Sequence, residues 1–354
     1  MSAPVPTTPA PGAPAPGAEP LLAVEDLRVR FTRRGRAPVT AVDGVSFTVG
    51  AGEVVGLVGE SGCGKSVTSL AVMGLLPRRG AHVEGSVRFA GTELLTLPPR
   101  ELARRRGKDL AMVFQDPMTS LNPVLTLGRQ LTEVLRAHTD LTRAQARAEA
   151  VDLLGRVGIP DPRRRAGEYP HQLSGGMRQR VLIATALACS PRLIIADEPT
   201  TALDVTIQAQ VLDLLTALVR ESGTAMLLIT HDLGVVAGTC DRVNVLYAGR
   251  VVEQAPRREL FAAPRHRYTT GLLGAVPRVD APEGTPLRPV PGSVRDRLPW
   301  AEGCAFLPRC GRGDDACRAG EVALAPQGPA HAARCVHPAG AAEPAGPAVA
   351  GGAR

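Results

Sequence analysis

The stretch GESGCGKS at residues 59–66 decides how the rest of the sequence is interpreted. It fits the pattern G-x-x-x-x-G-K-[ST], it follows the apolar run EVVGLVG, and it opens the helical pattern KSVTSLAVMGLL. A strand, a glycine-rich loop and a helix in this order point backbone N–H groups at phosphate oxygens, and the helix N-terminus adds partial positive charge. We therefore predict a phosphate-binding loop, in which Lys65 reaches the β- and γ-phosphates and Ser66 ligates Mg²⁺.

The whole of this loop is predicted to contact a bound nucleotide. Cys63 is expected to fill space in the loop rather than to act as a catalytic thiol. The predicted contacts are Gly59, Glu60, Ser61, Gly62, Cys63, Gly64, Lys65 and Ser66.

A second motif, RLIIADEP at residues 192–199, is typical of a buried strand that ends in two carboxylates. Asp197 is predicted to lie in the Mg²⁺ shell, directly or through water, and Glu198 to polarise the attacking water. An adjacent Asp–Glu pair can also simply mark the end of a strand. Its combination with the phosphate-binding loop favours a nucleoside triphosphatase.

Strands and helices alternate on both sides of these motifs, which indicates an α/β fold. Residues from about 121 to 190 have helical spacing without a strand pattern, so we expect a helical subdomain inserted there. From about residue 277 the chain is rich in proline, glycine and cysteine, which indicates a small appended region. The expected divisions are a disordered tail at 1–20, the main domain at 21–262, a C-terminal extension at 263–337 and a second disordered tail at 338–354.

A third motif, LSGGMRQR at residues 173–180, places a Ser-Gly-Gly turn at the start of a predicted helix. Such a turn is a second anion cradle, although alone it is usually only a helix cap. One nucleotide cannot readily use two separate cradles of one chain. We therefore predict a dimer in which Ser174, Gly175 and Gly176 cover the γ-phosphate bound by the partner's phosphate-binding loop.

The order of these motifs, followed by TALD at 201–204 and His231 at the end of a predicted strand, carries a specific resemblance. Residues 22–262 resemble the nucleotide-binding subunit of an ATP-binding cassette (ABC) transporter. The resemblance implies a P-loop NTPase core that binds ATP and Mg²⁺ and hydrolyses the ATP to ADP and phosphate.

The same resemblance assigns roles to individual residues. Gln115 in VFQDP resembles the glutamine that senses Mg²⁺ and the attacking water and couples to the membrane subunits. Glu198 resembles the catalytic base, and His231 the histidine that contacts the γ-phosphate and supports this base. Asp204 resembles the aspartate at the dimer seam. The family stacks an aromatic ring on the adenine, for which Phe31 is the candidate.

Two features resemble the oligopeptide/dipeptide importer branch of this family. One is QDPMTSLNP at 115–123, and the other is the tail with PRHRYTTGLLGAVPR at 264–278 and GCAFLPRC at 303–310. The resemblance implies two transmembrane permease subunits, a second ABC ATPase (self or a paralogue) and an extracytoplasmic solute-binding protein as partners. It implies a peripheral position on the cytoplasmic face of the cell membrane. The transported solute is a di- or oligopeptide in most such proteins and nickel or another small solute in some.

Composition narrows the remaining alternatives. The 354 residues are 44% hydrophobic and 21% charged, which fits one or two globular domains, and no run approaches the 18 apolar residues of a membrane span. Aromatic residues are only 3%, which argues against a surface that stacks nucleic-acid bases, so no nucleic-acid partner is expected. Two alternative hypotheses remain: a soluble ABC ATPase that acts on ribosomes or DNA, and the ATPase of an exporter.

The last four cysteines, Cys304, Cys310, Cys317 and Cys335, crowd the predicted C-terminal extension. Their spacing, C-x5-C-x6-C-x17-C, is too wide for a simple C-x2-C zinc knuckle. Four thiolates can ligate a [4Fe–4S] cluster, and similar cysteine sets in the importer branch are associated with one. A cluster, a zinc ion and four free thiols all stay open at this point.

Overall fold

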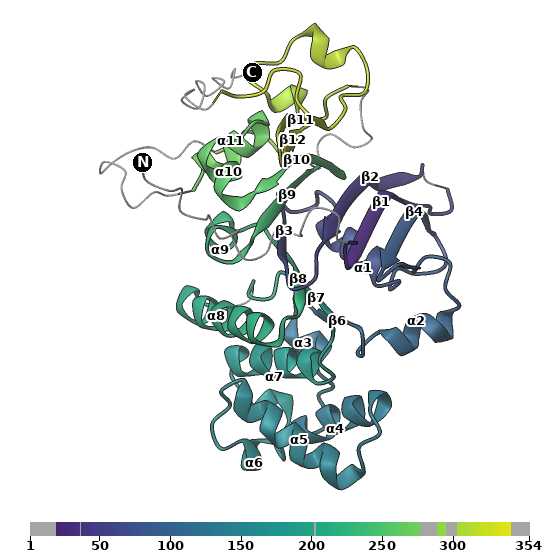
Figure 1. Ribbon diagram of the computed structural model, residues 1–354, viewed down its shortest axis with the longest axis vertical. Coiled ribbons are helices and arrows are strands. Elements are labelled where there is room, and N and C mark those ends of the chain that lie inside the picture. The colour runs from purple at the N-terminus through teal and green to yellow at the C-terminus, as the bar shows by residue number, and fades with distance from the viewer. Residues whose placement is uncertain (1–18, 36, 202, 277–288, 295–302, 341–354) are drawn as a thin grey trace, which may run out of the picture.

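The computed structural model describes residues 19–35, 37–201, 203–276, 289–294 and 303–340. Most of the two tails expected to be disordered, and the end of the stretch at 264–278, lie outside these residues. A bundle of helices lies at one end of the molecule and the C-terminal segment at the other, with the β-sheets between them (Figure 1).

A parallel sheet forms the centre of the molecule. Across this sheet the strands are β9 (Arg242–Tyr247), β3 (Val54–Val58), β8 (Ala225–Thr230), β7 (Leu193–Asp197) and β6 (Leu110–Val113). These strands are buried on both faces, as their continuous apolar runs predict. Alternate residues serve the two faces, since Val54 and Val58 join one core and Val55 and Leu57 the other.

A second, antiparallel sheet covers one face of the central sheet (Figure 1). It consists of β2 (Val39–Val49), β1 (Leu22–Phe31), β4 (Ala81–Phe89) and β5 (Thr92–Glu93). Helix α1 (Lys65–Val72) lies between the two sheets and buries Ala71 and Val72 in the core that they share. Helix α2 (Pro99–Arg105) follows this sheet. The phosphate-binding loop lies between the two sheets, since Gly59 approaches Leu246 at the end of the central sheet and Gly64 approaches Ala41 in β2.

The stretch between β6 and β7 is helical throughout, in agreement with its sequence pattern. It contains α3 (Pro117–Ser120), α4 (Leu127–His138), α5 (Arg143–Arg156), α6 (Pro162–Arg165), the 3₁₀ turn η1 (Pro170–Gln172) and α7 (Gly175–Leu187). Thr142 and Gln145 form a reciprocal capping box that starts α5. Leucines of α4 and α5, among them Leu131 and Leu154, are fully buried against α7 and so join this subdomain to the main core.

The chain after β7 returns to the central sheet. It forms α8 (Val205–Ser222), α9 (Leu233–Thr239), β10 (Arg250–Pro256), α10 (Arg257–Ala262) and α11 (Arg267–Gly274). The C-terminal segment adds the 3₁₀ turns η3 (Leu307–Arg309) and η4 (Asp315–Arg318) and the strands β11 (Ala325–Gly328) and β12 (His331–Ala333).

The C-terminal strands extend the central sheet, which the sequence did not lead us to expect. β12 pairs antiparallel with β10, and β11 pairs with β12. A buried hydrogen bond fixes this junction, with His331 Nε2 at 2.6 Å from Glu253 Oε1. The Glu253 carboxylate also accepts the backbone N–H groups of Arg265 and His266. Within the described residues no helix is long and apolar enough to cross a membrane.

Candidate functional site

The phosphate-binding loop connects β3 to α1, as predicted, and its glycines are required by close backbone contacts. A Cβ atom at Gly59, where φ is +153°, would lie 2.2 Å from the carbonyl oxygen of Leu246. At Gly64, where φ is +107°, it would lie 2.6 Å from the carbonyl oxygen of Ala41. Only glycine fits these two positions, so the loop keeps the curvature that turns its N–H groups toward one point.

A cavity of about 620 Å³ opens over this loop, which is the size of a site for one small molecule or nucleotide. The predicted residues Gln115, Glu198 and His231 line it together with the loop residues other than Cys63. Cys63 was also predicted to contact the nucleotide, but it is buried and does not line the cavity. Ala41, Thr201 and Leu272 also line it, and the sequence did not single these out. Residues far apart in the chain meet here because the parallel strands that carry them end at one edge of the sheet.

Lys65 lies at the base of the cavity with only 4% of its side chain exposed. Its Nζ donates to the carbonyl oxygens of Gly59 at 2.7 Å and of Glu60 at 3.1 Å. It also lies 3.7 Å from Glu198 Oε1. The ammonium group is therefore fixed where it can meet the phosphates of a nucleotide cradled by the loop.

Asp197 forms the buried end of β7 and fits the predicted Mg²⁺ site. Its two carboxylate oxygens accept hydrogen bonds from the hydroxyl groups of Ser66, at 3.0 Å, and Ser69, at 3.2 Å. Burial raises the pKa of Asp197 above its ordinary value, and these hydrogen bonds oppose part of the rise. A buried carboxylate beside a hydroxyl group at the phosphate-binding loop is the oxygen donor set that Mg²⁺ prefers.

Glu198 is the centre of the polar contacts in the cavity. Its Oε2 accepts a hydrogen bond from Gln115 Nε2 at 3.2 Å and from Thr201 Oγ1 at 2.9 Å. Its Oε1 lies 3.5 Å from Nδ1 of His231. Glu198 also has a φ of +45°, a conformation that costs energy in a residue other than glycine and is found at functional sites. Thr201 belongs to the TALD motif, in which the sequence had drawn attention only to Asp204.

Four further predicted residues do not line this cavity and lie at the starts of two helices. Ser174 caps α7 by accepting the N–H of Met177 at 3.3 Å, and Asp204 caps α8 by accepting the N–H of Ile207 at 3.0 Å. Gly176 lets these helices approach, since a Cβ atom there would lie 2.6 Å from Ile207 Cγ2. Ser174 and Gly175 are exposed.

Phe31, the candidate for stacking on adenine, is likewise not brought to the cavity. It ends β1, where it pairs with Val39 and with Ala81, and it is partly buried against the core between the sheets. Among the described residues, the cavity lining includes the apolar residues Ala41, Val67 and Leu272.

The four C-terminal cysteines converge on a second, much smaller cavity. Cys304, Cys310, Cys317 and Cys335 line it together with His266 and His337. Burial raises the pKa of the Cys304 thiol, and the neighbouring cysteines raise it further.

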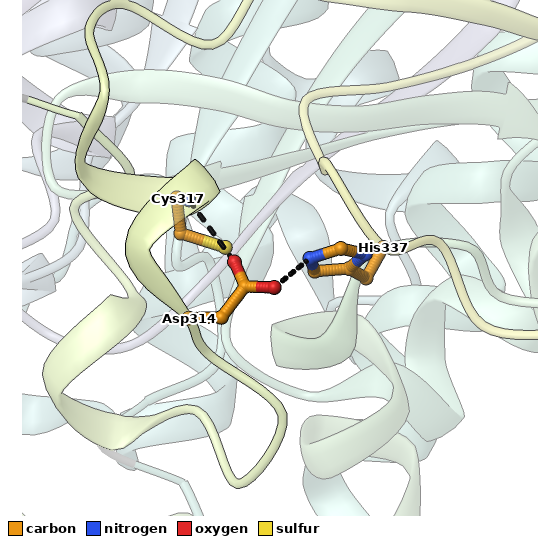
Figure 2. Close-up of side chains that lie close together, drawn as sticks. All are labelled: Asp314, Cys317 and His337. Atoms are coloured by element: carbon orange, nitrogen blue, oxygen red, sulfur yellow. Dashed lines mark hydrogen bonds and ion pairs between the residues drawn. The ribbon is translucent and has the colours of Figure 1, made fainter.

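Asp314 ties two of the cysteine-bearing segments together (Figure 2). One of its carboxylate oxygens accepts the backbone N–H of Cys317 at 3.3 Å, and the other lies 2.8 Å from Nε2 of His337. His337 is two residues from Cys335, so this contact joins the 314–317 turn to the last cysteine. The ligand atoms of Asp314, Cys317 and His337 lie within 4.8 Å of one another.

The nucleotide cavity has the arrangement expected of a nucleoside triphosphatase, and comparison with known proteins places the chain in a family. The profile of ABC transporters matches residues 42–201, and that of the oligopeptide/dipeptide transporter C-terminal region matches residues 252–317. The chain belongs to the ATPases of the ABC transporter family. It therefore binds and hydrolyses ATP, as the motifs predicted.

Similar proteins support this assignment over most of the chain. A putative peptide import ATP-binding protein of Brucella abortus (strain 2308) is 52% identical over 329 residues, which are 90% of this chain and 97% of that protein. The oligopeptide transport ATP-binding protein OppD of Salmonella typhimurium is 52% identical over 300 residues, 85% of this chain and 89% of that one. Among solved structures, a dimeric ATP-binding cassette bound to ADP and phosphate has a TM-score of 0.59 at 29% identity. It covers 67% of this chain and 99% of its own.

Proposed function

We propose that this chain is the ATP-hydrolysing subunit of an importer that carries di- or oligopeptides across the cytoplasmic membrane. The observation that carries the proposal is the combination of the Glu198-centred cavity with a C-terminal region of the oligopeptide/dipeptide transporter type at 252–317. The relatives from Brucella and Salmonella, which are named for peptide import and transport, support the same solute class.

Hydrolysis is assigned to the residues that line the cavity. Glu198 accepts a proton from a water molecule, whose oxygen attacks the γ-phosphorus while the bond to the ADP oxygen breaks. Gln115, Thr201 and His231 hold the carboxylate in place, and Lys65 balances the negative charge that develops on the phosphate oxygens. Ser66 and Gln115, and Asp197 directly or through water, would hold Mg²⁺, which would neutralise phosphate charge.

The complete site requires two ATPase subunits. Ser174, Gly175 and Gly176 of one subunit cover the γ-phosphate that lies on the loop of the other, and Asp204 lies at the seam. This arrangement is supported by the position of these residues outside the chain's own cavity and by the dimeric form of the similar cassette. The second subunit is another copy of this chain or a paralogue.

The remaining partners follow from the transporter role. Two transmembrane permease subunits contact the helical subdomain near Gln115, and an extracytoplasmic solute-binding protein delivers the peptide. The ATPase then lies on the cytoplasmic face of the cell membrane as a peripheral subunit. Closure of the dimer on ATP moves the helical subdomain and, through it, the permeases.

Co-purification and solute-stimulated hydrolysis test this proposal. Tagged full-length chain from its native cells is expected to bring down two hydrophobic permeases. ATP hydrolysis by the assembled complex should rise with a di- or oligopeptide and its binding protein, and should not rise with nickel. Stimulation by nickel alone would replace peptide as the solute, and recovery of ribosomes without any membrane protein would overturn the transporter role.

We further propose that Cys304, Cys310, Cys317 and Cys335 bind a [4Fe–4S] cluster, which would join the C-terminal segments covalently through iron. The donor set fits, because the four thiols line one cavity and thiolates are the ligands of such a cluster. The space between them is about 10 Å³, close to that of one water molecule, so cluster loading requires these segments to separate.

Anaerobic purification decides among the three occupants. Brown protein with iron and sulfide in equal amounts supports the cluster, and Cys189→Ser, at a half-buried cysteine outside this cavity, should keep it. Stoichiometric zinc would replace the cluster by a single ion, and colourless protein without metal would overturn metal binding.

A further inference from the structure

One arginine of the C-terminal segment reaches the phosphate-binding loop. Arg309 ends the 3₁₀ turn η3, and only 3% of its side chain is exposed. Its guanidinium group makes two parallel hydrogen bonds to Glu60, from Nη1 to Oε2 and from Nη2 to Oε1, each of 3.0 Å. Glu60 follows the first glycine of the loop, so this ion pair links residues 249 positions apart.

Arg309 is held firmly by the C-terminal segment itself. Its Nε donates to the carbonyl oxygen of Pro291 at 2.5 Å, and Nη2 donates to those of Val290 and Gly292, each at 3.2 Å. The guanidinium group also lies over the ring of Tyr247, 5.7 Å from its centroid. A side chain fixed by so many partners can impose its geometry on the loop that it contacts.

Glu60 is the residue of the loop that most needs such a partner. Glu60 lines the nucleotide cavity together with Lys65 and Ser66, so its negative charge lies close to the space that takes a polyphosphate. Two negative groups in one cavity repel each other, and partial burial strengthens this repulsion. The backbone N–H of Glu60 also donates to the hydroxyl oxygen of Tyr268 at 2.9 Å, which fixes the main chain beside the ion pair.

We propose that Arg309 is a positioning residue for nucleotide binding. It neutralises the Glu60 carboxylate and holds it aside, so that the C-terminal segment sets the affinity of the phosphate-binding loop for nucleotide. The proposal goes beyond the transport role, because it rests on nucleotide binding and not on which solute is carried. No contact of Arg309 with the nucleotide is required.

The test measures the affinity of full-length chain for MgADP by titration calorimetry. Arg309→Gln removes the positive charge and keeps hydrogen-bond donors for the nearby carbonyl groups, and it should weaken binding about tenfold. Arg309→Lys keeps the charge and should stay within threefold of the parent chain. The matched control is Arg318→Gln, since Arg318 pairs with Asp315 on the exposed surface of the same segment and should leave the affinity unchanged.

The Glu60→Gln background separates charge from folding. If Arg309 acts through the Glu60 carboxylate, Arg309→Gln should change the affinity less than twofold in this background. Any damage to the fold would weaken binding in both backgrounds, and thermal melting of each variant measures that damage. In the assembled transporter the KM for ATP should rise with Arg309→Gln while kcat stays within twofold.

Two results would overturn the proposal. One is an unchanged MgADP affinity in Arg309→Gln, and the other is an equal loss of affinity with and without the Glu60 carboxylate. If the peptide-transport proposal were wrong, no peptide would stimulate ATP hydrolysis. That result would not affect the comparison of MgADP affinities, which tests Arg309 separately.

Discussion

The nucleotide cavity and the cysteine cavity are built in different ways. The first is open, measures about 620 Å³ and draws its residues from strand ends along one edge of the parallel sheet. The second measures about 10 Å³ and is lined mostly by residues of irregular segments and 3₁₀ turns. A sheet edge fixes the positions of its side chains before any ligand arrives, whereas irregular segments depend on their mutual contacts. The two cavities should therefore respond differently to loss of a single residue.

The largest effect is expected at the centre of the nucleotide cavity. Glu198→Gln should lower the rate of ATP hydrolysis by the assembled complex about 10³-fold, because the amide cannot accept the proton of the attacking water. ATP binding should persist, so the dimer should stay closed and elute as a dimer with trapped ATP. Glu221→Gln, at an exposed glutamate near the end of α8, is the control and should hydrolyse ATP normally. Undiminished hydrolysis in Glu198→Gln would show that Glu198 is not the general base.

Lys65→Met is expected to act first on ATP binding. The buried ammonium group is the positive charge at the base of the cavity, so its loss should weaken ATP binding on the order of 100-fold in equilibrium titration. The chain supplies its own control, because Lys108 is its other lysine and is exposed. Equal affinities in Lys65→Met and Lys108→Met would contradict the role of the loop.

Most of the nucleotide cavity could be predicted from the sequence, for a physical reason. The motifs at 59–66 and 192–199 each combine an apolar strand with the polar residues that follow it, and parallel strands end at the same sheet edge. Local sequence therefore encodes the position in space. Thr201 was missed because its hydroxyl group binds Glu198 through a turn that the strand pattern does not reveal.

The C-terminal segment could be predicted much less well. Its four cysteines predict a shared site, because thiols are common metal ligands. No sequence periodicity predicts that β12 pairs with β10 or that Arg309 contacts Glu60. Those contacts join residues tens to hundreds of positions apart through irregular backbone. Phe31 shows a second limit, since the residue type made it the candidate for stacking on adenine but the fold leaves it outside the cavity lining.

A smaller effect is expected at the rim of the nucleotide cavity. His231 leaves 57% of its side chain exposed and lies 3.5 Å from Glu198, so it supports the carboxylate without carrying the chemistry. His231→Ala should lower kcat about tenfold and change the affinity for ATP much less. His82→Ala, at an exposed histidine of β4, should leave both quantities unchanged. A loss of affinity without a loss of rate would place His231 in nucleotide binding instead.

The smallest effect on nucleotide binding is expected from the cysteine cavity. Cys304→Ser should release bound metal and lower the melting temperature by roughly 5 °C, because a ligand that binds only the folded state stabilises it. Affinity for MgADP should change less than threefold, since the groups that hold Arg309 against Glu60 are carbonyl oxygens and a tyrosine rather than the cysteines. Cys189→Ser should alter neither quantity. A tenfold loss of affinity in Cys304→Ser would show that the two cavities act as one unit, with the thiol-lined segment setting the position of Arg309.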